Sequence, residues 1–287
     1  MNKNKIINAA MIGLLLTLGI GGCTDIKNVQ RDNKIIEVQD ISNSQVDITV
    51  MDIGKADCIL IKLQDKAVMI DTGLDKYGAS IVDRLKESNI DTLEYLILTH
   101  MDKDHIGGAD KIIDNIKINN LIQADYIKES KQYSEYEESL KKNNINPVRL
   151  HTEISTEING VQINIYPAEK DYYKQSNDYS IIVELKYGNY NFLFAGDAED
   201  ERLKEFLTNN NTQYTFVKIP HHGRNDSMSE AFIKSTSPVY AAITCSDEEV
   251  PDEELLNILK KNNVKTYLTS DGEIEIKTDG KSISFSR

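Results

Sequence analysis

The sequence predicts an α/β chain, with α+β features, in which β-sheets are covered by helices over one domain spanning residues 47–287. Two observations support this prediction. Short apolar runs typical of strands interleave with amphipathic runs typical of helices through this whole stretch, and hairpin signals occur among them. The chain has 287 residues, of which 40% are hydrophobic and 28% charged, so it can bury a large core and is not disordered throughout.

The first half of this domain begins with strand-like runs and ends with a charged helix. The third run leads into the turn sequence Asp71-Thr72-Gly73, and a later helix carries apolar residues on one face. A buried strand then runs directly into His100, with Gly107-Gly108 shortly after. The expected elements are strands 47–51, 58–62 and 66–70, helix 79–88, strand 93–98, a helix-like stretch to 116, strand 118–123 and helix 130–144.

The second half repeats the alternation of strands and helices. A hairpin signal, Gly188-Asn189, joins two of its strands, and another strand runs into His221. The chain finishes with two strands on either side of Asp279-Gly280. The other expected elements are strands 161–166, 179–187 and 190–195, helix 199–209, strands 216–220 and 239–244, helix 253–262 and strand 264–268.

The first residues have the pattern of an export signal. Lys3 and Lys5 precede a short apolar run, and small residues then lead to Cys23, which predicts a secretory signal over residues 1–22. The run is too short for a comfortable membrane span. The small residues ending at a Cys resemble the lipobox of bacterial lipoproteins, which implies a lipid on Cys23 and an extracytoplasmic protein held at the membrane by that anchor alone. An ordinary signal peptide or an N-terminal anchor helix is the alternative, and polar residues 23–46 predict a flexible tether.

The charge balance limits the partners of the chain. The formal net charge is −13, and loss of residues 1–22 would lower it to −15 because it removes two lysines and no acidic residue. Such a surface repels polyanions, and no cluster of Lys and Arg is present, so long duplex DNA is not an expected partner. Cys58 and Cys245 each lie in a strand-like run and are expected to be buried free thiols, which excludes a disulfide scaffold.

Four of the five histidines occur in two short loops, and each loop directly follows an apolar strand. The ends of strands are where a rigid scaffold presents functional groups. In the first loop, His100, Asp102 and Asp104 can point one way if the loop is extended, and His105 joins them at the turn. Imidazole and carboxylate ligands suit zinc, manganese or iron, so we expect one or two divalent ions, with zinc or manganese preferred.

Three further positions complete the expected metal centre. Asp197, in Gly196-Asp197 after a strand, is a candidate carboxylate bridge between two ions. At least one of His221 and His222 is a candidate ligand, and the other would orient it or contact the substrate. Asp71 is a candidate brace that holds the first loop through hydrogen bonds, although a plain turn residue has the same pattern.

Taken in order, these motifs resemble those of the metallo-β-lactamase superfamily, and in particular the hydrolase domain of ComEC-type competence proteins. The resemblance covers roughly residues 47–285. It is carried by residues 51–57, residues 70–73, the 100–105 loop with Gly107-Gly108, residues 177–180, Gly196-Asp197 and residues 220–223.

The resemblance implies a four-layer αββα sandwich with a two-metal site at one edge. The positions that match ligands of the family are His100, Asp102, Asp104, His105, Asp197 and one of His221 and His222. Many members carry His where this chain has Asp102, and Asp there is similar to the branch that acts on phosphodiesters.

Two departures from the family pattern bear on the number of ions. Lys55-Ala56 replaces a common Gln-Gly in the opening motif. Relatives usually carry a His after the strand that matches residues 239–244, and this chain has none there. Either Asp247, Glu248 or Glu249 substitutes for that ligand, or one metal site is weak.

The expected function is a surface-anchored, metal-dependent hydrolase that cleaves phosphodiesters, nuclease-like or acting on a small substrate. Asp104 and Arg224 are the candidate catalytic residues, with Arg224 as the cation that stabilises developing charge. A lactam or thioester hydrolase on the same fold, and a non-catalytic surface lipoprotein, are the alternatives. The oligomeric state is left open.

Overall fold

The computed structural model describes residue 41 and residues 45–287. The predicted signal 1–22, Cys23 and nearly all of the predicted tether lie outside the described residues, so they stay predictions. In the part of the chain that is described, no helix is both long enough and apolar enough to cross a membrane.

The first sheet has eight strands in the order β15-β14-β1-β2-β3-β4-β5-β6. Pairing is antiparallel from β15 to β3 and parallel from β3 to β6. Parallel neighbours end at the same edge of a sheet, so Asp71 after β3 and His100 after β4 emerge close together. The strands are β1 (Val46–Val50), β2 (Ile59–Leu63), β3 (Lys66–Ile70), β4 (Thr92–Leu98), β5 (Lys117–Gln123), β6 (Val148–Arg149), β14 (Ile274–Thr278) and β15 (Ile283–Ser286).

The second sheet has seven strands in the order β13-β12-β11-β10-β9-β8-β7. Here β10 to β13 run parallel, so the segments that follow β10, β11 and β12 also emerge at one edge. Those segments carry Asp197, the His221–His222 pair and Thr244. The strands are β7 (Ile154–Ile158), β8 (Val161–Tyr166), β9 (Ile182–Tyr187), β10 (Tyr190–Phe194), β11 (Phe216–Lys218), β12 (Tyr240–Ile243) and β13 (Lys265–Leu268).

The central strands of the second sheet, β10 to β12, are buried on both faces. Phe192 and Phe216 point into the core shared with the first sheet, whereas Leu193 and Val217 point into a second core beneath α5, α6 and α7. Side chains alternate faces along a strand, so an apolar run fills both cores at once. The helices are α1 (Gly78–Glu87), α2 (Lys103–Ile106), α3 (Ala109–Asn115), α4 (Lys131–Asn143), α5 (Asp200–Asn209), α6 (Ser229–Thr236) and α7 (Glu253–Lys261).

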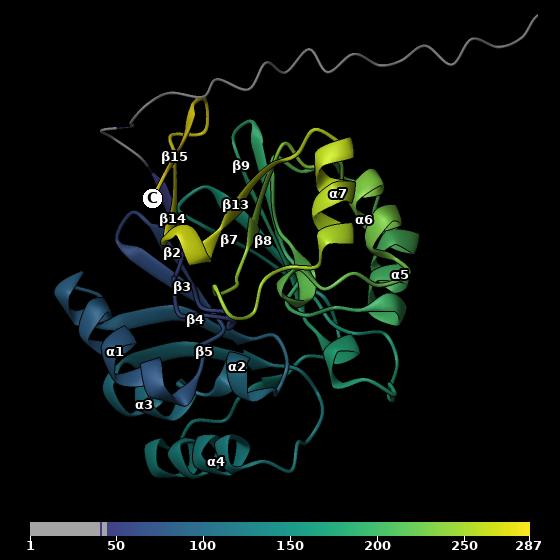
Figure 1. The fold of residues 1–287 in the computed structure, drawn as a ribbon. Helices are drawn as coiled ribbons and strands as arrows, with labels where there is room; N and C mark the ends of the chain where they lie inside the picture. The colour runs from purple at the N-terminus through teal and green to yellow at the C-terminus, as the bar shows by residue number, and fades with distance from the viewer. Residues whose placement is uncertain (1–40, 42–44) are drawn as a thin grey trace, which may run out of the picture. The chain divides into compact units, whose positions relative to one another are not determined.

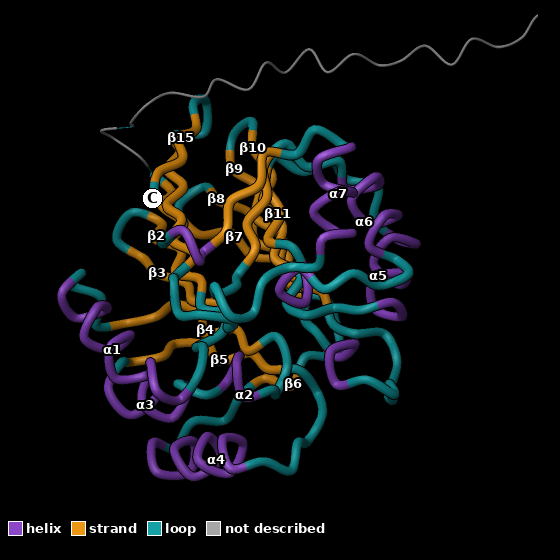
Figure 2. The backbone as a smooth tube through the Cα atoms, in the orientation of Figure 1, coloured by secondary structure: helices purple, strands orange, loops and turns teal. Residues whose placement is uncertain are grey.

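The layers follow from this packing. Helices α1, α3 and α4 lie on the outer side of the first sheet, and α5, α6 and α7 lie on the outer side of the second (Figure 1). The strands occupy the space between the two groups of helices (Figure 2). The predicted αββα sandwich is therefore confirmed for the described residues.

Three elements escaped the sequence analysis for local reasons. β6 has only two residues, β7 alternates half-buried with exposed side chains, and α6 is a short helix between loops. The expectation that the first loop is extended from His100 to His105 was also wrong. Residues Lys103–Ile106 form the helical turn α2 instead.

Cys58 and Cys245 are free and fully buried, as predicted. Burial raises the pKa of the Cys58 thiol, which further suppresses the reactive thiolate. In a Cys23→Ser variant, we therefore expect neither thiol to react with a water-soluble disulfide reagent until denaturant is added. Absorbance of the released thiolate would follow the reaction, and fast labelling of the native protein would contradict the prediction.

Candidate metal centre

The loop after β4 turns sharply and presents consecutive ligand-type side chains. Asp102 keeps an extended backbone, with φ −80° and ψ 150°, and the N–H groups of His105 and Ile106 then donate to its carbonyl oxygen. The turn packs so closely that a Cβ on Gly107 would lie 2.4 Å from the Asp75 nitrogen. Glycine is required there because this backbone approach leaves no room for a side chain.

Asp71 holds this loop from the neighbouring strand. Its Oδ2 lies 2.8 Å from His105 Nδ1, and the backbone N–H and hydroxyl of Thr99 each donate to the same carboxylate at 2.7 Å. Asp71 therefore lies where the sequence analysis expected a bracing residue. With Nδ1 donating to Asp71, His105 directs its Nε2 into the site.

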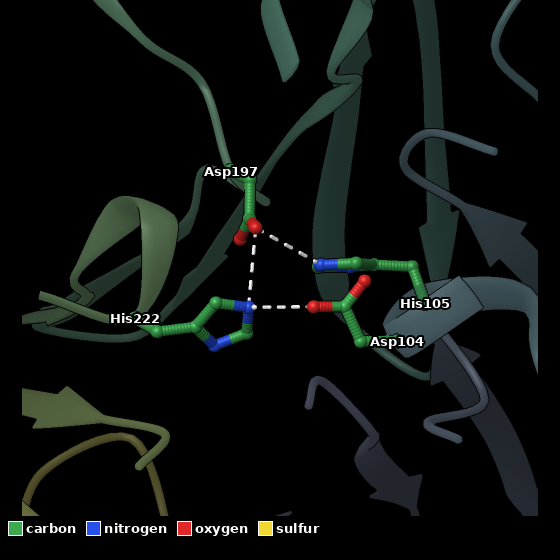
Figure 3. A group of neighbouring side chains, drawn as sticks. All are labelled: Asp104, His105, Asp197 and His222. Atoms are coloured by element: carbon green, nitrogen blue, oxygen red, sulfur yellow. Dashed lines mark ion pairs between the residues drawn. The ribbon is translucent and has the colours of Figure 1, made fainter. Parts of the chain in front are cut away.

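Four side chains from three loops converge at the edge of the sandwich (Figure 3). Asp197 Oδ2 lies 3.2 Å from His105 Nε2 and 3.1 Å from His222 Nε2. Asp104 Oδ2 lies 3.6 Å from His222 Nε2. One ligand-type atom from each of these four residues lies within 4.8 Å of all the others, which is the spacing of atoms around a single ion.

Thr244 and Asp57, on the side of His222 away from the cluster, determine which ring nitrogen of His222 carries the proton in the neutral ring. The Thr244 hydroxyl donates to Asp57 Oδ1 at 2.7 Å, so its oxygen is left to accept from His222 Nδ1 at 2.9 Å. The hydroxyl has only one proton to donate, and Asp57 receives it. In the neutral ring the Nε2 of His222 therefore carries the lone pair. Burial opposes a charged ring, but Asp197 and Asp104 raise its pKa, so a proton or a cation at that atom is favoured.

These residues fit a divalent ion. The Nε2 atoms of His100, His105 and His222 are buried and accept no hydrogen bond from any residue in the described part of the chain. Buried polar atoms are normally paired, and two of these nitrogens instead face one carboxylate oxygen. Two imidazoles and two carboxylates form a donor set suited to zinc, manganese or iron.

The electrostatics favour positive charge at the same point. Burial opposes the charged form of Asp197, but His222 and His105 hold the pKa of its carboxyl well below the usual range. Burial likewise opposes a charged His105, yet Asp197 and Asp71 raise its pKa well above the ordinary value. Protons or a bound cation can supply the positive charge that these carboxylates favour.

The adjacent residues His221 and His222 point their side chains to different places. Both have left-handed backbones, with φ of 48° and 52°, a conformation that is uncommon outside glycine. His222 is buried in the cluster, whereas the side chain of His221 is 26% exposed and contacts Glu199 and Asn177. The structure thus places His222 in the cluster of metal-ligand type and His221 at its opening, whereas the sequence had left both histidines as candidates.

The comparisons with known proteins agree with this geometry. The sequence model of the metallo-beta-lactamase superfamily matches residues 51–245. The chain belongs to the metallo-beta-lactamase superfamily. It is accordingly a hydrolase of the metallo-beta-lactamase fold with candidate metal-binding residues at the expected edge of the sandwich.

Curated relatives of this superfamily member include competence proteins. The chain is 23% identical to ComE operon protein 3 of Bacillus subtilis over 85% of its own length and 34% of the relative. It is 23% identical to the competence protein ComA of Neisseria gonorrhoeae over 80% of its length and 32% of the relative. The chain therefore spans about a third of the length of these relatives. The predicted resemblance to ComEC-type proteins is confirmed.

Solved structures share the fold at low sequence identity. The metallo hydrolase Igni18 from Ignicoccus hospitalis has a TM-score of 0.53 at 13% identity, covering 81% of this chain and 100% of that one. Tm1679, a metal-dependent hydrolase of the beta-lactamase superfamily, has a TM-score of 0.54 at 14% identity with the same coverage.

In this metallo-beta-lactamase domain, His100 and Asp102 lie beside the four-residue cluster but outside it. The His100 ring centroid is 4.0 Å from that of His105, and burial and the charge of His105 lower the pKa of His100 to about 3. His100 is therefore neutral and its Nε2 is available to a cation. Asp102 instead pairs with Lys128 and accepts a hydrogen bond from Ser176 at 3.2 Å, so an ion shared by His100 and Asp102 would compete with Lys128.

Other expected site residues are directed elsewhere. Arg224 was predicted to be the cation of the pocket, but its Nη1 donates to Asp252 at 2.9 Å, and it does not reach the cluster. The backbone causes this, because Gly223 is left-handed and Arg224 then leaves the site toward the start of α7. The acidic stretch after β12 is exposed, so the structure does not place a substitute for the missing His there. It joins neither the four-residue cluster nor the second group of metal-ligand type among the described residues, which consists of Asp57, Asp71 and His105. That stretch consists of Asp247, Glu248 and Glu249.

Among the described residues, Lys218 is a cation that does reach the cluster, and the sequence analysis missed it. It is fully buried, forms an ion pair with Asp57 and lies 3.7 Å from Asp197 Oδ1. The sequence does contain a pattern that could have identified Lys218. This lysine, three residues before His221, interrupts an otherwise apolar strand. Charged residues are almost never fully buried unless they are paired.

Proposed function

We propose that this chain is a metal-dependent phosphodiesterase, nuclease-like or acting on a small phosphodiester. The observation that carries the proposal is the convergence of Asp104, His105, Asp197 and His222 on one point, with two imidazole nitrogens facing a shared carboxylate oxygen. That arrangement supports the binding of one divalent ion, zinc or manganese, and His100 supports a second, weaker position beside it.

The choice of phosphodiesters is supported by the relatives and by the loop. The matched proteins include a competence protein and Recombination protein 2 of Haemophilus influenzae, names that point to nucleic acid chemistry. Asp102, where many members of the superfamily carry His, is in line with a phosphodiester substrate. The net charge of −13 favours small or single-stranded substrates over long duplexes.

The side chains of the site have different roles in the proposed hydrolysis. A bound ion would supply charge stabilisation and water activation in a phosphodiester hydrolase. Asp104, whose side chain reaches the cluster from the rim of the site, is positioned to orient the attacking water. His221, held by Glu199 at 3.1 Å and Asn177 at 3.3 Å, is at the opening, where it can contact the substrate.

We also propose that the protein acts outside the cytoplasm, held at the membrane by a lipid on Cys23. The support is the basic start, the short apolar run and the small residues before that cysteine. Metabolic labelling with a radioactive fatty acid, compared with a Cys23→Ser variant, would test the anchor.

Purified protein should hydrolyse a chromogenic phosphodiester when manganese or zinc is supplied, and a chelator should abolish that activity. A His100→Ala/Asp197→Ala double variant should be inactive under the same conditions, because it removes groups that bind the ion. A chromogenic lactam and a thioester, tested in parallel, would reveal the alternative activities. Equal rates for both proteins, independent of metal, would overturn the proposal, and metal binding without any hydrolysis would favour a non-catalytic module.

A further inference from the structure

We propose that Asp57, Thr244 and Lys218 form a positioning network, here called the buried relay, that sets the ion affinity of the centre by orienting His222 and Asp197. The inference rests on the proposed metal centre and assigns roles to three residues that contact no substrate. Each comes from a different segment: the loop before β2, the end of β12 and the end of β11.

The first arm of the relay fixes the ring of His222. Asp57 is acceptor-only as a carboxylate, so the Thr244 hydroxyl proton points toward it and the hydroxyl oxygen must accept from His222 Nδ1. With Nδ1 protonated, Nε2 is the nitrogen available to a cation. Partners of this kind orient the ring and raise the basicity of the coordinating nitrogen.

The second arm holds Asp197. The Lys218 ammonium contacts the Gly196 carbonyl oxygen at 3.2 Å and lies 3.7 Å from Asp197 Oδ1, while its ion pair with Asp57 fixes it in place. A cation on Oδ1 leaves Oδ2 directed at His105 and His222. The relay therefore determines which oxygen of Asp197 faces the ion.

Asp57 also ties the relay to the first metal loop through its backbone. Its N–H donates to the Asp104 carbonyl oxygen at 3.1 Å, and its own carbonyl accepts from the Gly73 N–H at 2.8 Å. Asp57 thus connects the segments that carry Asp104, His222 and, through Lys218, Asp197. It is buried at 1% exposure, and an unpaired carboxylate at that depth would be costly.

The test compares two substitutions at Thr244 in the metal-stripped full chain, titrated with cobalt(II) and zinc. Thr244→Val keeps the shape but removes the hydroxyl, so the dissociation constant should rise about 10- to 100-fold and the visible spectrum of the cobalt protein should change. Thr244→Ser, which keeps the hydroxyl, should restore most of the affinity. If the valine variant fails to fold, Thr244→Ala serves instead, because it also removes the hydroxyl and leaves the ion pair between Asp57 and Lys218 in place.

The matched control is Glu184→Gln. Glu184 is also a fully buried carboxylate, but it pairs with groups that do not contact the cluster, namely Asn164, Tyr166, Tyr214 and Lys186. This variant should lose stability in denaturant without a change in the cobalt dissociation constant. If Thr244→Val binds cobalt with wild-type affinity and spectrum, the relay is overturned and the metal centre stands. If the wild type itself binds no metal, both proposals fail.

Discussion

Asp197→Asn should lose nearly all metal-dependent hydrolysis and most of the metal affinity of the protein. The substitution keeps the size of the side chain but removes the charge that both His105 Nε2 and His222 Nε2 face. Loss of an ion's contribution to charge stabilisation is worth several kcal/mol, which corresponds to roughly a thousand-fold in rate. Steady-state rates on a chromogenic phosphodiester and metal content by elemental analysis would measure the two effects.

A matched substitution separates this effect from a general loss of charge. Asp114 is a surface carboxylate that contacts Ser139, Lys142 and Asn143, away from the metal loops. Asp114→Asn should leave both rate and metal content near those of the wild type. An Asp197→Asn protein that keeps a full complement of tightly bound ion and its activity would remove Asp197 from the centre.

Lys218→Met should lower the free energy of unfolding by about 3–5 kcal/mol, the usual cost of removing one member of a buried ion pair. Methionine has a similar length but leaves Asp57 charged and buried without its cation. Burial lowers the pKa of Lys218, but Asp57 and Asp197 outweigh burial and raise it, so the lysine is charged in the wild type. Urea unfolding followed by circular dichroism would measure the loss.

Two further variants test the electrostatic cause of this loss. In Asp57→Asn/Lys218→Met both charges are gone, so a large part of the lost stability should return. Lys142→Met removes an exposed cation paired with Asp114, and exposed pairs contribute less than about 1 kcal/mol. If Lys218→Met were as stable as Lys142→Met, the buried pair would not carry the charge assigned to it.

Local patterns along the chain were sufficient to predict most strands and helices. The run 192–195 is apolar throughout and ends at Gly196, and the run 240–243 is apolar throughout as well, which predicts strands buried on both faces. The same patterns placed the chemistry at strand ends, because His100 and Asp197 each follow such a run. Elements without a strong apolar period, such as β7 and α6, could not be recognised in this way.

The sequence by itself determined most of the strands and helices and the loops that carry the candidate ligands, because periodicity and turn residues act over a few neighbouring positions, whereas the αββα sandwich was implied by the resemblance to the superfamily. Only the tertiary structure decided which side chains meet. Left-handed backbones at His221 and His222 separate two adjacent rings, and Asp252 draws Arg224 away from the site. Lys218 and Asp57, 161 positions apart, pair at Asp197 because the order and parallel direction of the strands bring their ends to one edge.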